Sequence, residues 1–404
     1  MFVALRNRNF RLLWIGSLSA FVSFFTSNVV QSVVAFELTA ENRAVGLVVF
    51  GRGLGQLVLA PIGGALADRL NKRTILVSTQ SLTAAVFFLL SWLSATGRLQ
   101  VAHLTGTGFL IGLTFAVLGP ARSAYIVDVV AQEHRGNAIA LNQVALNFSR
   151  VVGPALAGVL LGAHAGGAST AFAIMGALYA AAVATQYLLP PPEPPQGARR
   201  GLLFDVAAGF SYVRGDPRLR ALLAMFMLTV MLGFPYVTVL PGFVEHQLGL
   251  PSTTVSMLFS ISAVGGLLAS LVGAQIADSK YAMAAFRGSG IVFGISVALL
   301  WFAHSLQVTA VLLFVVGVAS GVFTTLNGAV LMRYTDPRYM GRVMSLAMLA
   351  FGAFGLIGVP VGALADALGE GATLAVLGAL VCAVLAVLRV PESAPAVGSP
   401  VSPP

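Results

Sequence analysis

The stretch Gly64-Ala65-Leu66-Ala67-Asp68-Arg69-Leu70-Asn71-Lys72-Arg73 joins two long apolar segments and decides the fold class. After a glycine, it places one carboxylate and three cations. They stand where an apolar helix long enough to cross a bilayer would end. Charges at such a boundary can be paired in one conformation and unpaired in another. The pattern therefore indicates a membrane protein that closes and reopens one of its sides.

The composition of the whole chain supports this interpretation. The 404 residues are 57% hydrophobic and only 9% charged, whereas a soluble domain carries roughly 25% charged residues. A chain this apolar must be solvated largely by lipid, and a helix that crosses the bilayer needs about 20 apolar residues. We therefore predict an all-α membrane protein with twelve spans, approximately at residues 11–36, 44–67, 74–94, 102–127, 138–163, 170–189, 219–243, 253–277, 285–303, 308–331, 342–365 and 372–390.

The basic residues predict the orientation of these spans. On one side the loops hold 16 lysines and arginines and the span edges two more, whereas the other side holds only Arg43 and Arg98. Because cytoplasmic loops carry the excess of positive charge, we expect both termini in the cytoplasm of a bacterial cell, with the protein in its inner membrane. The net charge of +9 is then a topology signal and indicates no nucleic-acid partner.

A polar interruption divides the chain into two parts. Residues 190–218 begin with a proline-rich run that predicts a stiff extended linker, followed by an amphipathic helix on the cytoplasmic face. We predict four regions: an N-terminal six-helix bundle at 1–189, this linker, a C-terminal six-helix bundle at 219–391 and a disordered tail at 392–404.

The two predicted bundles are related by an internal repeat. A shift of 205 residues superposes Gly136 on Gly341 and Gly153 on Gly358. Two such repeats around an axis normal to the membrane place a substrate cavity at their interface, where one half rocks against the other. The pentapeptide GALAD also recurs at 362–366, and we interpret that copy as a chance repeat in sequence rich in Ala, Gly and Leu.

Several stretches resemble a known family. They are Phe10-Arg11-Leu12-Leu13-Trp14, the loop Gly64 to Arg73, Pro120-Ala121-Arg122, Gly153-Pro154-Ala155-Leu156-Ala157-Gly158 and Gly341-Arg342-Val343-Met344-Ser345-Leu346. Over essentially its whole length the chain resembles a major facilitator superfamily transporter, and more narrowly the drug-exporter group that includes macrolide and siderophore efflux proteins. The resemblance implies a monomer that exports an amphipathic small organic molecule by alternating access, without a cofactor and in exchange for protons.

The resemblance also implies a conformational gate. Asp68 would latch the cytoplasmic side against the other half, with Arg122 as our candidate partner; the alternative is that these charges only determine topology. Asn71 replaces the family's turn glycine, and asparagine tolerates the left-handed conformation. The predicted gate and helix-packing residues are Gly64, Asp68, Arg69, Lys72, Arg73, Arg122, Gly153, Pro154 and Gly158.

Polar and aromatic residues inside the spans predict the substrate cavity. Arg150 lies about twelve residues into its span, near the midplane, where an unpaired charge is costly. It faces water, binds an anionic substrate group or donates to backbone carbonyls, and the sequence leaves these alternatives open. The full set of predicted cavity residues is Ser27, Gln31, Arg52, Asn142, Asn147, Arg150, Phe234, Tyr236, Asn327 and Phe351.

Proton coupling has weak support from the residues. The nearest candidates are Glu37, at the outer end of the first span, and Asp128, at the inner end of the fourth, although we favour the alternative that both are solvated helix-end residues. The same alternative applies to His103, His246 and His304. Because Cys382 is the only cysteine, and neither a phosphate-binding loop nor a metal-spaced cluster is present, we expect no metal site and no enzyme. A nutrient importer, a lysophospholipid flippase and a membrane receptor are the competing functions.

Overall fold

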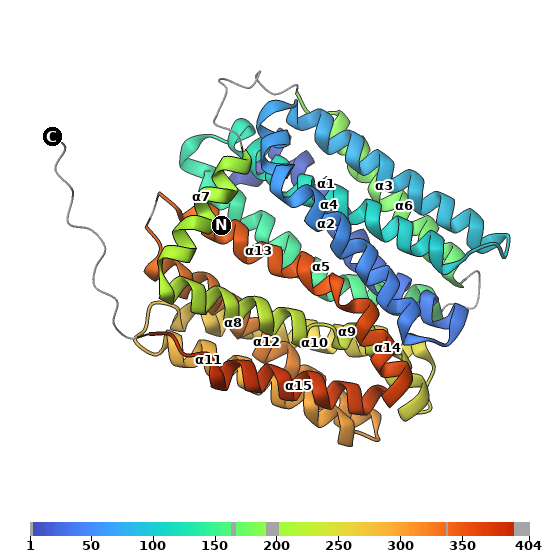
Figure 1. Ribbon diagram of the computed structural model, residues 1–404. Helices are drawn as coiled ribbons and strands as arrows, with labels where there is room; N and C mark the ends of the chain where they lie inside the picture. The colour runs from blue at the N-terminus through green and yellow to red at the C-terminus, as the bar shows by residue number, and fades with distance from the viewer. Residues whose placement is uncertain (1–2, 163–166, 191–201, 337, 392–404) are drawn as a thin grey trace.

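The computed structural model describes residues 3–162, 167–190, 202–336 and 338–391, and it describes the backbone alone at 61–69, 202–208, 271 and 274. Long helices lie side by side (Figure 1). The first half of the molecule comprises η1 (Val3–Arg6), α1 (Arg8–Thr39), α2 (Asn42–Arg69), α3 (Lys72–Ala95), α4 (Val101–Val129), η2 (Gln132–His134), α5 (Arg135–Gly162) and α6 (Gly167–Tyr187).

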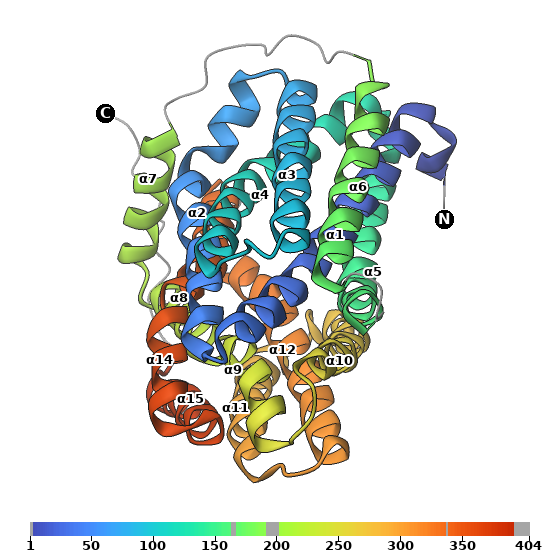
Figure 2. The ribbon, with the colours of Figure 1, turned by 90° about the vertical axis from the view of Figure 1, so that its right-hand side faces the viewer.

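The second half follows a connecting helix, α7 (Leu202–Gly215), which forms inside the predicted linker. It comprises α8 (Pro217–Gly233), α9 (Tyr236–Gly242), η3 (Phe243–Gln247), η4 (Ser252–Thr254), α10 (Val255–Ile276), α11 (Ala282–Leu299), η5 (Leu300–Phe302), α12 (Leu306–Tyr334), α13 (Met340–Leu356), α14 (Gly358–Leu368) and α15 (Glu370–Val387). Figure 2 shows the two halves as separate groups of helices, with α7 at their edge.

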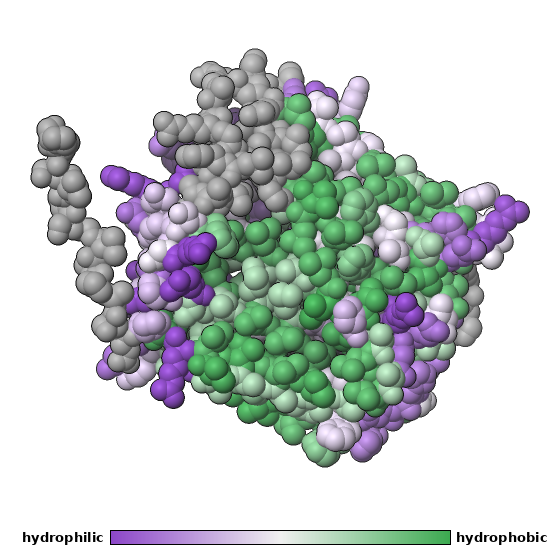
Figure 3. Space-filling view, in the orientation of Figure 1, coloured by the Kyte–Doolittle hydropathy of each residue, from purple (hydrophilic) through white to green (hydrophobic). Residues whose placement is uncertain are grey.

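The predicted number of spans is confirmed. Within the described residues, twelve helical segments are long and apolar enough to cross a membrane. The surface has a broad hydrophobic band, and hydrophilic residues gather towards the two ends of the helices (Figure 3). The predicted fold class, all-α with twelve spans, is therefore the observed one.

Two spans differ from the continuous helices that we expected at 219–243 and 342–365. The first is broken between α8 and α9, just before the helix start at Tyr236, and the second between α13 and α14 at Ile357. Prolines explain both breaks, because Pro235 and Pro360 have no N–H group to continue the ladder of backbone hydrogen bonds. In the first half, by contrast, Pro120 and Pro154 lie inside continuous helices.

Side-chain caps fix the starts of several helices. The Asn71 side chain accepts a hydrogen bond from the Thr74 N–H at 3.2 Å, and Asp216 caps α8 in the same way through Arg218. Asn71 has φ −61° and ψ 116°, so it is an extended N-cap and the left-handed turn that we expected does not form. Asparagine suits both conformations, and the start of α3 directly after it selects the cap.

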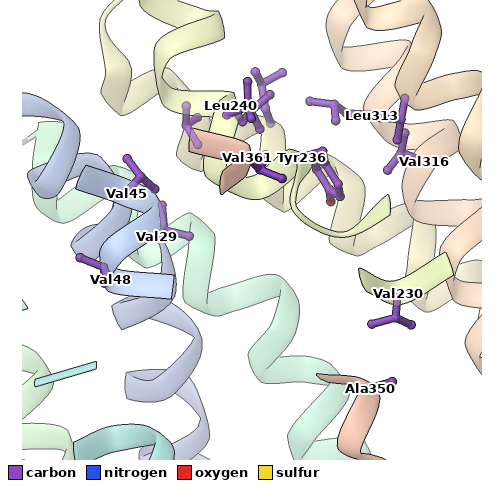
Figure 4. Packing of buried hydrophobic residues seen from close by; sticks show 14 of the residues in the cluster. Val29, Val45, Val48, Val230, Tyr236, Leu240, Leu313, Val316, Ala350 and Val361 are labelled. Carbon is purple, nitrogen blue, oxygen red and sulfur yellow. The ribbon is translucent and has the colours of Figure 1, made fainter. Parts of the chain in front are cut away.

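The molecule has two ends, which we name for the following sections. The linker end holds the start of α1, the end of α4 and α7; the far end holds the end of α1, the start of α2 and the end of α14. One hydrophobic cluster includes residues of both halves, and Figure 4 shows Val29, Val45 and Val48 from the first half with Val361 and Leu240 from the second. A second cluster, around Phe10, Leu76 and Tyr125, contains first-half residues only and lies at the linker end.

Candidate functional site

Three arginines lie within spans of the first half, each beside a phenylalanine of α1. The guanidinium carbon of Arg122 is 4.2 Å from the centre of the Phe21 ring. For Arg52 and Phe24 this distance is 5.7 Å, and for Arg150 and Phe25 it is 5.8 Å. Cation–π contacts of this kind stabilise a cation by about 0.5–2 kcal/mol. The sequence predicted the position of these charges in their spans, and the structure adds the aromatic partners.

The polar partners of these arginines are few among the described residues. Arg52 donates from Nη2 to the Gln31 side-chain oxygen at 3.0 Å, and its Nε is buried without a partner. Arg122 is only 2% exposed, and neither its Nε nor its Nη2 finds an acceptor. Arg150 keeps an exposed side chain. Two of the predicted cavity residues, Gln31 and Arg52, are thus in direct contact.

Ser23, Ser27 and Gln31, spaced four residues apart, form a polar stripe along α1 that divides between two environments. Gln31 reaches Arg52, whereas Ser27 is fully buried and its hydroxyl donates to the Phe24 carbonyl of its own helix. Ser23, on the same stripe, donates to the Met175 carbonyl of α6 at 3.0 Å. Ser27 therefore has no open surface in this conformation and occupies a packing position.

The three aromatic residues predicted for the cavity in the second half lie in one aromatic cluster. Phe351 of α13 is 5.9 Å, centre to centre, from both Phe226 and Phe234, and Phe234 is 5.5 Å from Phe293. Tyr236 continues the cluster, 6.4 Å from Phe293. The cluster follows from the break between α8 and α9, which places Phe234 and Tyr236 on either side of the break.

Asparagines of both halves complete the predicted set. Asn142 and Asn147, on α5, are half-buried. Asn327 on α12 is 4% exposed, and its side-chain oxygen has no hydrogen-bond partner in the described part of the chain. An unpaired buried carbonyl of this kind costs about 1–3 kcal/mol, so Asn327 keeps an unused hydrogen-bond acceptor in this conformation.

The two halves meet closely where α2 crosses α13 and α14. A Cβ atom on Gly53 would lie 2.6 Å from the Gly352 carbonyl oxygen, and one on Gly46 would lie 2.3 Å from the Gly358 carbonyl oxygen. These glycines therefore let the two backbones touch. Since Arg52 precedes Gly53 and Phe351 precedes Gly352, the crossing brings together the helix that carries this arginine and the helix that carries this phenylalanine.

At the far end, a carboxylate joins the two halves. Asp366 accepts hydrogen bonds from the backbone N–H groups of Asn42 and Arg43, at 2.7 and 2.9 Å. Asn42 also donates from its side chain to Asp366, at 3.1 Å, and to Glu370, at 2.8 Å. The first N–H groups of a helix lack partners inside it and attract anions, so Asp366 caps α2 from the other half. Our interpretation of 362–366 as a chance repeat missed this contact.

The titratable groups that we assigned to solvated helix ends have specific partners. Glu37 accepts a hydrogen bond from the Ser252 hydroxyl of the other half at 3.0 Å, and it also lines a hollow of about 210 Å³ within the first half. His246 Nδ1 lies 2.7 Å from a carboxylate oxygen of Glu370. Asp128 pairs with Lys72 at 2.6 Å. Glu37, His246 and Asp128 are nevertheless all exposed, so these contacts lie at solvent-accessible helix ends and the solvated interpretation stays a prediction.

The predicted gate at the linker end is only partly described. The side chains of Gly64, Asp68 and Arg69 lie outside the described residues, so the expected contact between Asp68 and Arg122 is not visible. Lys72 pairs with Asp128, and Arg73 donates to the Tyr187 carbonyl and stacks on its ring. Both cations thus contact their own half.

The predicted packing residues of α5 contact two different helices. A Cβ on Gly153 would lie 2.8 Å from the Thr26 backbone nitrogen of α1, and the Thr26 hydroxyl donates to the Gly153 carbonyl. A Cβ on Gly158 would lie 3.0 Å from that of Ser256 on α10, across the two halves. Pro154 follows Gly153 inside the helix. Positions 153 and 158 therefore have no room for a larger side chain.

The sequence missed three residues of the far end: Asn42, Asp366 and Glu370. One signal was present, because the second GALAD copy ends at Asp366 as the first ends at Asp68. Asn42 and Glu370 carried no comparable signal, since each is a polar residue at a helix start.

The fold and the site define a class: a polytopic membrane protein of two helical halves, the first with arginines inside its spans and the second with an aromatic cluster. The model of the Major Facilitator Superfamily matches residues 13–359 and 236–402. The chain belongs to this superfamily of transporters, so it is a secondary transporter and not an enzyme, with a small-molecule substrate and a place in the membrane.

Its named relatives are distant but extend over most of the chain. It is 26% identical to the staphyloferrin A transporter of Staphylococcus aureus over 85% of this chain and 86% of that protein. It is 24% identical to macrolide efflux protein A of Streptococcus pyogenes (89% and 88% covered) and 25% identical to an enterobactin exporter of Shigella flexneri (94% and 92% covered).

Solved structures share the fold. The crystal structure of a nucleoside transporter, NupG, matches with a TM-score of 0.79 at 14% identity, covering 94% of this chain and 98% of that one. A bacterial homologue of the lysosomal transporter Spinster, in an inward-facing and unoccupied conformation, matches with a TM-score of 0.72 at 14% identity (94% and 95% covered). At this identity the likeness concerns the fold alone.

Proposed function

We propose that this protein exports an amphipathic small organic molecule from a bacterial cell by alternating access, in exchange for protons. The crossing of α2 and α13 carries the proposal. It brings the helix of Arg52, with its polar contact to Gln31, against the helix of Phe351, with its aromatic cluster. A ligand with one polar and one apolar side matches the polar residues of the first helix and the aromatic cluster of the second.

The relatives support the direction and the kind of substrate. Three of them are named as a macrolide efflux protein, an enterobactin exporter and a staphyloferrin A transporter, and all handle organic molecules. The distribution of basic residues supports an orientation with the linker end in the cytoplasm. In that orientation the far end, where hydrogen bonds join the halves, faces the outside.

Carboxylates at the ends of the spans are our candidates for proton coupling. Glu37 hydrogen-bonds across the halves through Ser252, and Glu370, which the sequence did not suggest, is 8% exposed beside Asn42 and His246. The Glu37–Ser252 and Glu370–Asn42 hydrogen bonds join the two halves, so both must break if the far end opens. Protonation of these carboxylates and opening of the far end can therefore be linked. Asp128 pairs inside its own half and is the weaker candidate.

Transport in proteoliposomes tests the proposal. Purified protein is reconstituted with labelled macrolides, siderophores and lysophospholipids, and flux is followed with and without an imposed pH gradient. We expect accumulation of an amphipathic drug or siderophore that collapses when the gradient is dissipated, and we expect Glu370→Gln to lose the response to the gradient. Flux that is equal with and without the gradient would reject proton exchange, and flux of polar nutrients alone would reject export of amphipathic molecules.

One observation favours a second candidate, a lysophospholipid flippase. A hollow of about 450 Å³ lies between α5 and α10, lined by Gly158, Val159 and Met257 among others. Val159 is 68% exposed and Met257 45% exposed, so the hollow borders the apolar outer surface. The same proteoliposome assay separates the candidates, because a flippase would move fluorescent lysophospholipid faster than any water-soluble substrate.

A further inference from the structure

The lysines and arginines of the chain fall into two groups. Of 23, twenty lie in loops or at span edges by the sequence-based topology. The remaining three, Arg52, Arg122 and Arg150, lie inside spans, and all three belong to the first half. Topology explains the twenty but not the three.

These three cations surround one turn of α1. The three arginines lie on Phe21, Phe24 and Phe25, and Phe25 is four residues after Phe21, or about 6 Å along a helix that rises 1.5 Å per residue. The same positions fall within about 100° of the helix circumference. The three guanidinium groups therefore lie near rings on the same side of α1 (Arg8–Thr39), midway along the helix.

No carboxylate lies among the described residues of this turn. The acidic residues of the first-half spans, Glu37 and Asp128, are at span ends and have other partners. A phenylalanine ring attracts a cation but carries no net charge. Three like charges held together in a poorly solvated region repel one another unless an anion joins them.

The polar atoms around this turn are also unsatisfied. Nε of Arg52 and both Nε and Nη2 of Arg122 are buried without an acceptor, as is the Gln31 amide nitrogen. All four of these atoms are donors, whereas Asn28 Oδ1, one turn further along α1, is an unsatisfied acceptor. The donors outnumber this acceptor and therefore favour an acceptor group. Arg122, only 2% exposed, supplies the fixed positive charge, while Arg52 is half-buried and Arg150 exposed, so both remain accessible.

We propose that this turn of α1 is an anion-binding site that holds a carboxylate group of the transported molecule. Arg52 and Arg150 contact the carboxylate, because a guanidinium pairs with two carboxylate oxygens at once. The apolar body of the same molecule lies towards Phe351 and Phe234, where α13 meets α2. The inference rests on the proposed function and narrows its substrate to amphipathic carboxylates.

Binding to the purified protein in nanodiscs tests the site without requiring transport. The probes are two matched pairs: coumarin-3-carboxylate with its uncharged amide, and 2-naphthoate with 2-naphthamide. For the wild-type protein we expect the carboxylate of at least one pair to bind at least tenfold more tightly than its amide. We expect Arg52→Gln and Arg150→Gln each to reduce this ratio to below threefold, and Arg52→Lys to retain part of it.

The variants avoid the buried Arg122, whose replacement also disturbs packing. Arg287→Gln is the matched control, because Arg287 is a span-edge arginine of the second half that donates to the Leu385 carbonyl. It should leave the carboxylate-to-amide ratio unchanged, and size-exclusion profiles confirm that each variant is folded.

The outcomes separate this inference from the proposed function. Equal binding of carboxylate and amide in both pairs, or a ratio that survives both Arg→Gln substitutions, overturns the anion site. If carboxylate binds tenfold more tightly than amide, this ratio depends on these arginines, and the protein shows no proton-driven export, the anion site is supported and the export mechanism is rejected.

Discussion

The two ends of this molecule are held in different ways. At the far end, hydrogen bonds from Asn42 and Arg43 to Asp366 join the halves, and the hydrophobic cluster there includes both halves. At the linker end, the described ion pair between Lys72 and Asp128 joins two helices of one half, and the cluster around Tyr125 contains that half alone. The far end is thus closed by contacts that a transporter must make and break.

The repeated pentapeptide makes the same comparison at the level of sequence. GALAD ends at Asp68 beside the linker end and at Asp366 beside the far end. Asp366 meets the start of α2, where the N–H groups of Asn42 and Arg43 donate to its carboxylate and the carboxylate caps the helix. Such a bond is broken at modest cost because water can replace the carboxylate, which suits a gate that opens in every cycle.

The largest effect is expected from a substitution that prevents closure of the far end. Gly46→Val places a Cβ atom 2.3 Å from the Gly358 carbonyl oxygen, so α2 and α14 cannot approach. We expect export in proteoliposomes to fall at least tenfold while the protein remains folded by size exclusion. Gly106→Val is the matched control, since nothing lies within 4 Å of a Cβ there. Wild-type export by Gly46→Val would show that this crossing need not be tight.

A smaller effect is expected from weakening the carboxylate cap. Asp366→Asn removes the charge that attracts the start of α2, and hydrogen bonds to charged groups contribute about 1.5–3 kcal/mol when buried and less when exposed. In a Cys382→Ser background, a thiol introduced by Val361→Cys, at a position only 6% exposed, should react several-fold faster with a water-soluble maleimide. Glu41→Gln, an exposed carboxylate next to Asn42, should leave the labelling rate unchanged. An unchanged labelling rate in Asp366→Asn would show that this cap does not keep the far end closed.

The spans of this protein were predictable from its sequence, whereas the helix breaks and the Asp366 contact were not. The spans were predictable because bilayer thickness imposes about 20 apolar residues on each. The breaks before Tyr236 and at Ile357 were not, because hydropathy does not register a missing N–H group at Pro235 or Pro360. Asp366 was missed because its partner Asn42 lies 324 residues away, and contact at that separation depends on how the halves pack.

The candidate site was predictable to a similar degree. Arg150 and Arg52 were recognisable as unusual because charge inside a span is costly wherever its side chain points. Their phenylalanine partners were not recognisable, because α1 is apolar around most of its circumference and hydropathy alone does not fix its rotation. Ser27 illustrates the same difficulty, since a polar stripe can face either a cavity or a neighbouring helix.

The linker end should respond to its own aspartate. If Asp68 acts there as Asp366 acts at the far end, Asp68→Asn should slow turnover about fivefold and change substrate affinity less than twofold, because the latch acts on the rate of closure. Transport rates and equilibrium binding are measured on the same preparation. Asp278→Asn is the control and should have a weaker effect, because a shift of 210 residues in the internal repeat pairs Asp68 with Asp278. An unchanged turnover rate in Asp68→Asn would leave these charges as topology determinants.

The smallest effect is expected from the ion pair that stays within one half. The side chains of Lys72 and Asp128 are 19% and 27% exposed, and pairs with exposure of this kind contribute about 0–1 kcal/mol. Asp128→Asn should therefore alter thermal unfolding only slightly, with a smaller difference at high salt, and transport should stay within twofold of wild type. Loss of the response to a pH gradient in this variant would make Asp128 the coupling carboxylate. The proton would then bind at the linker end, away from the contacts that join the halves.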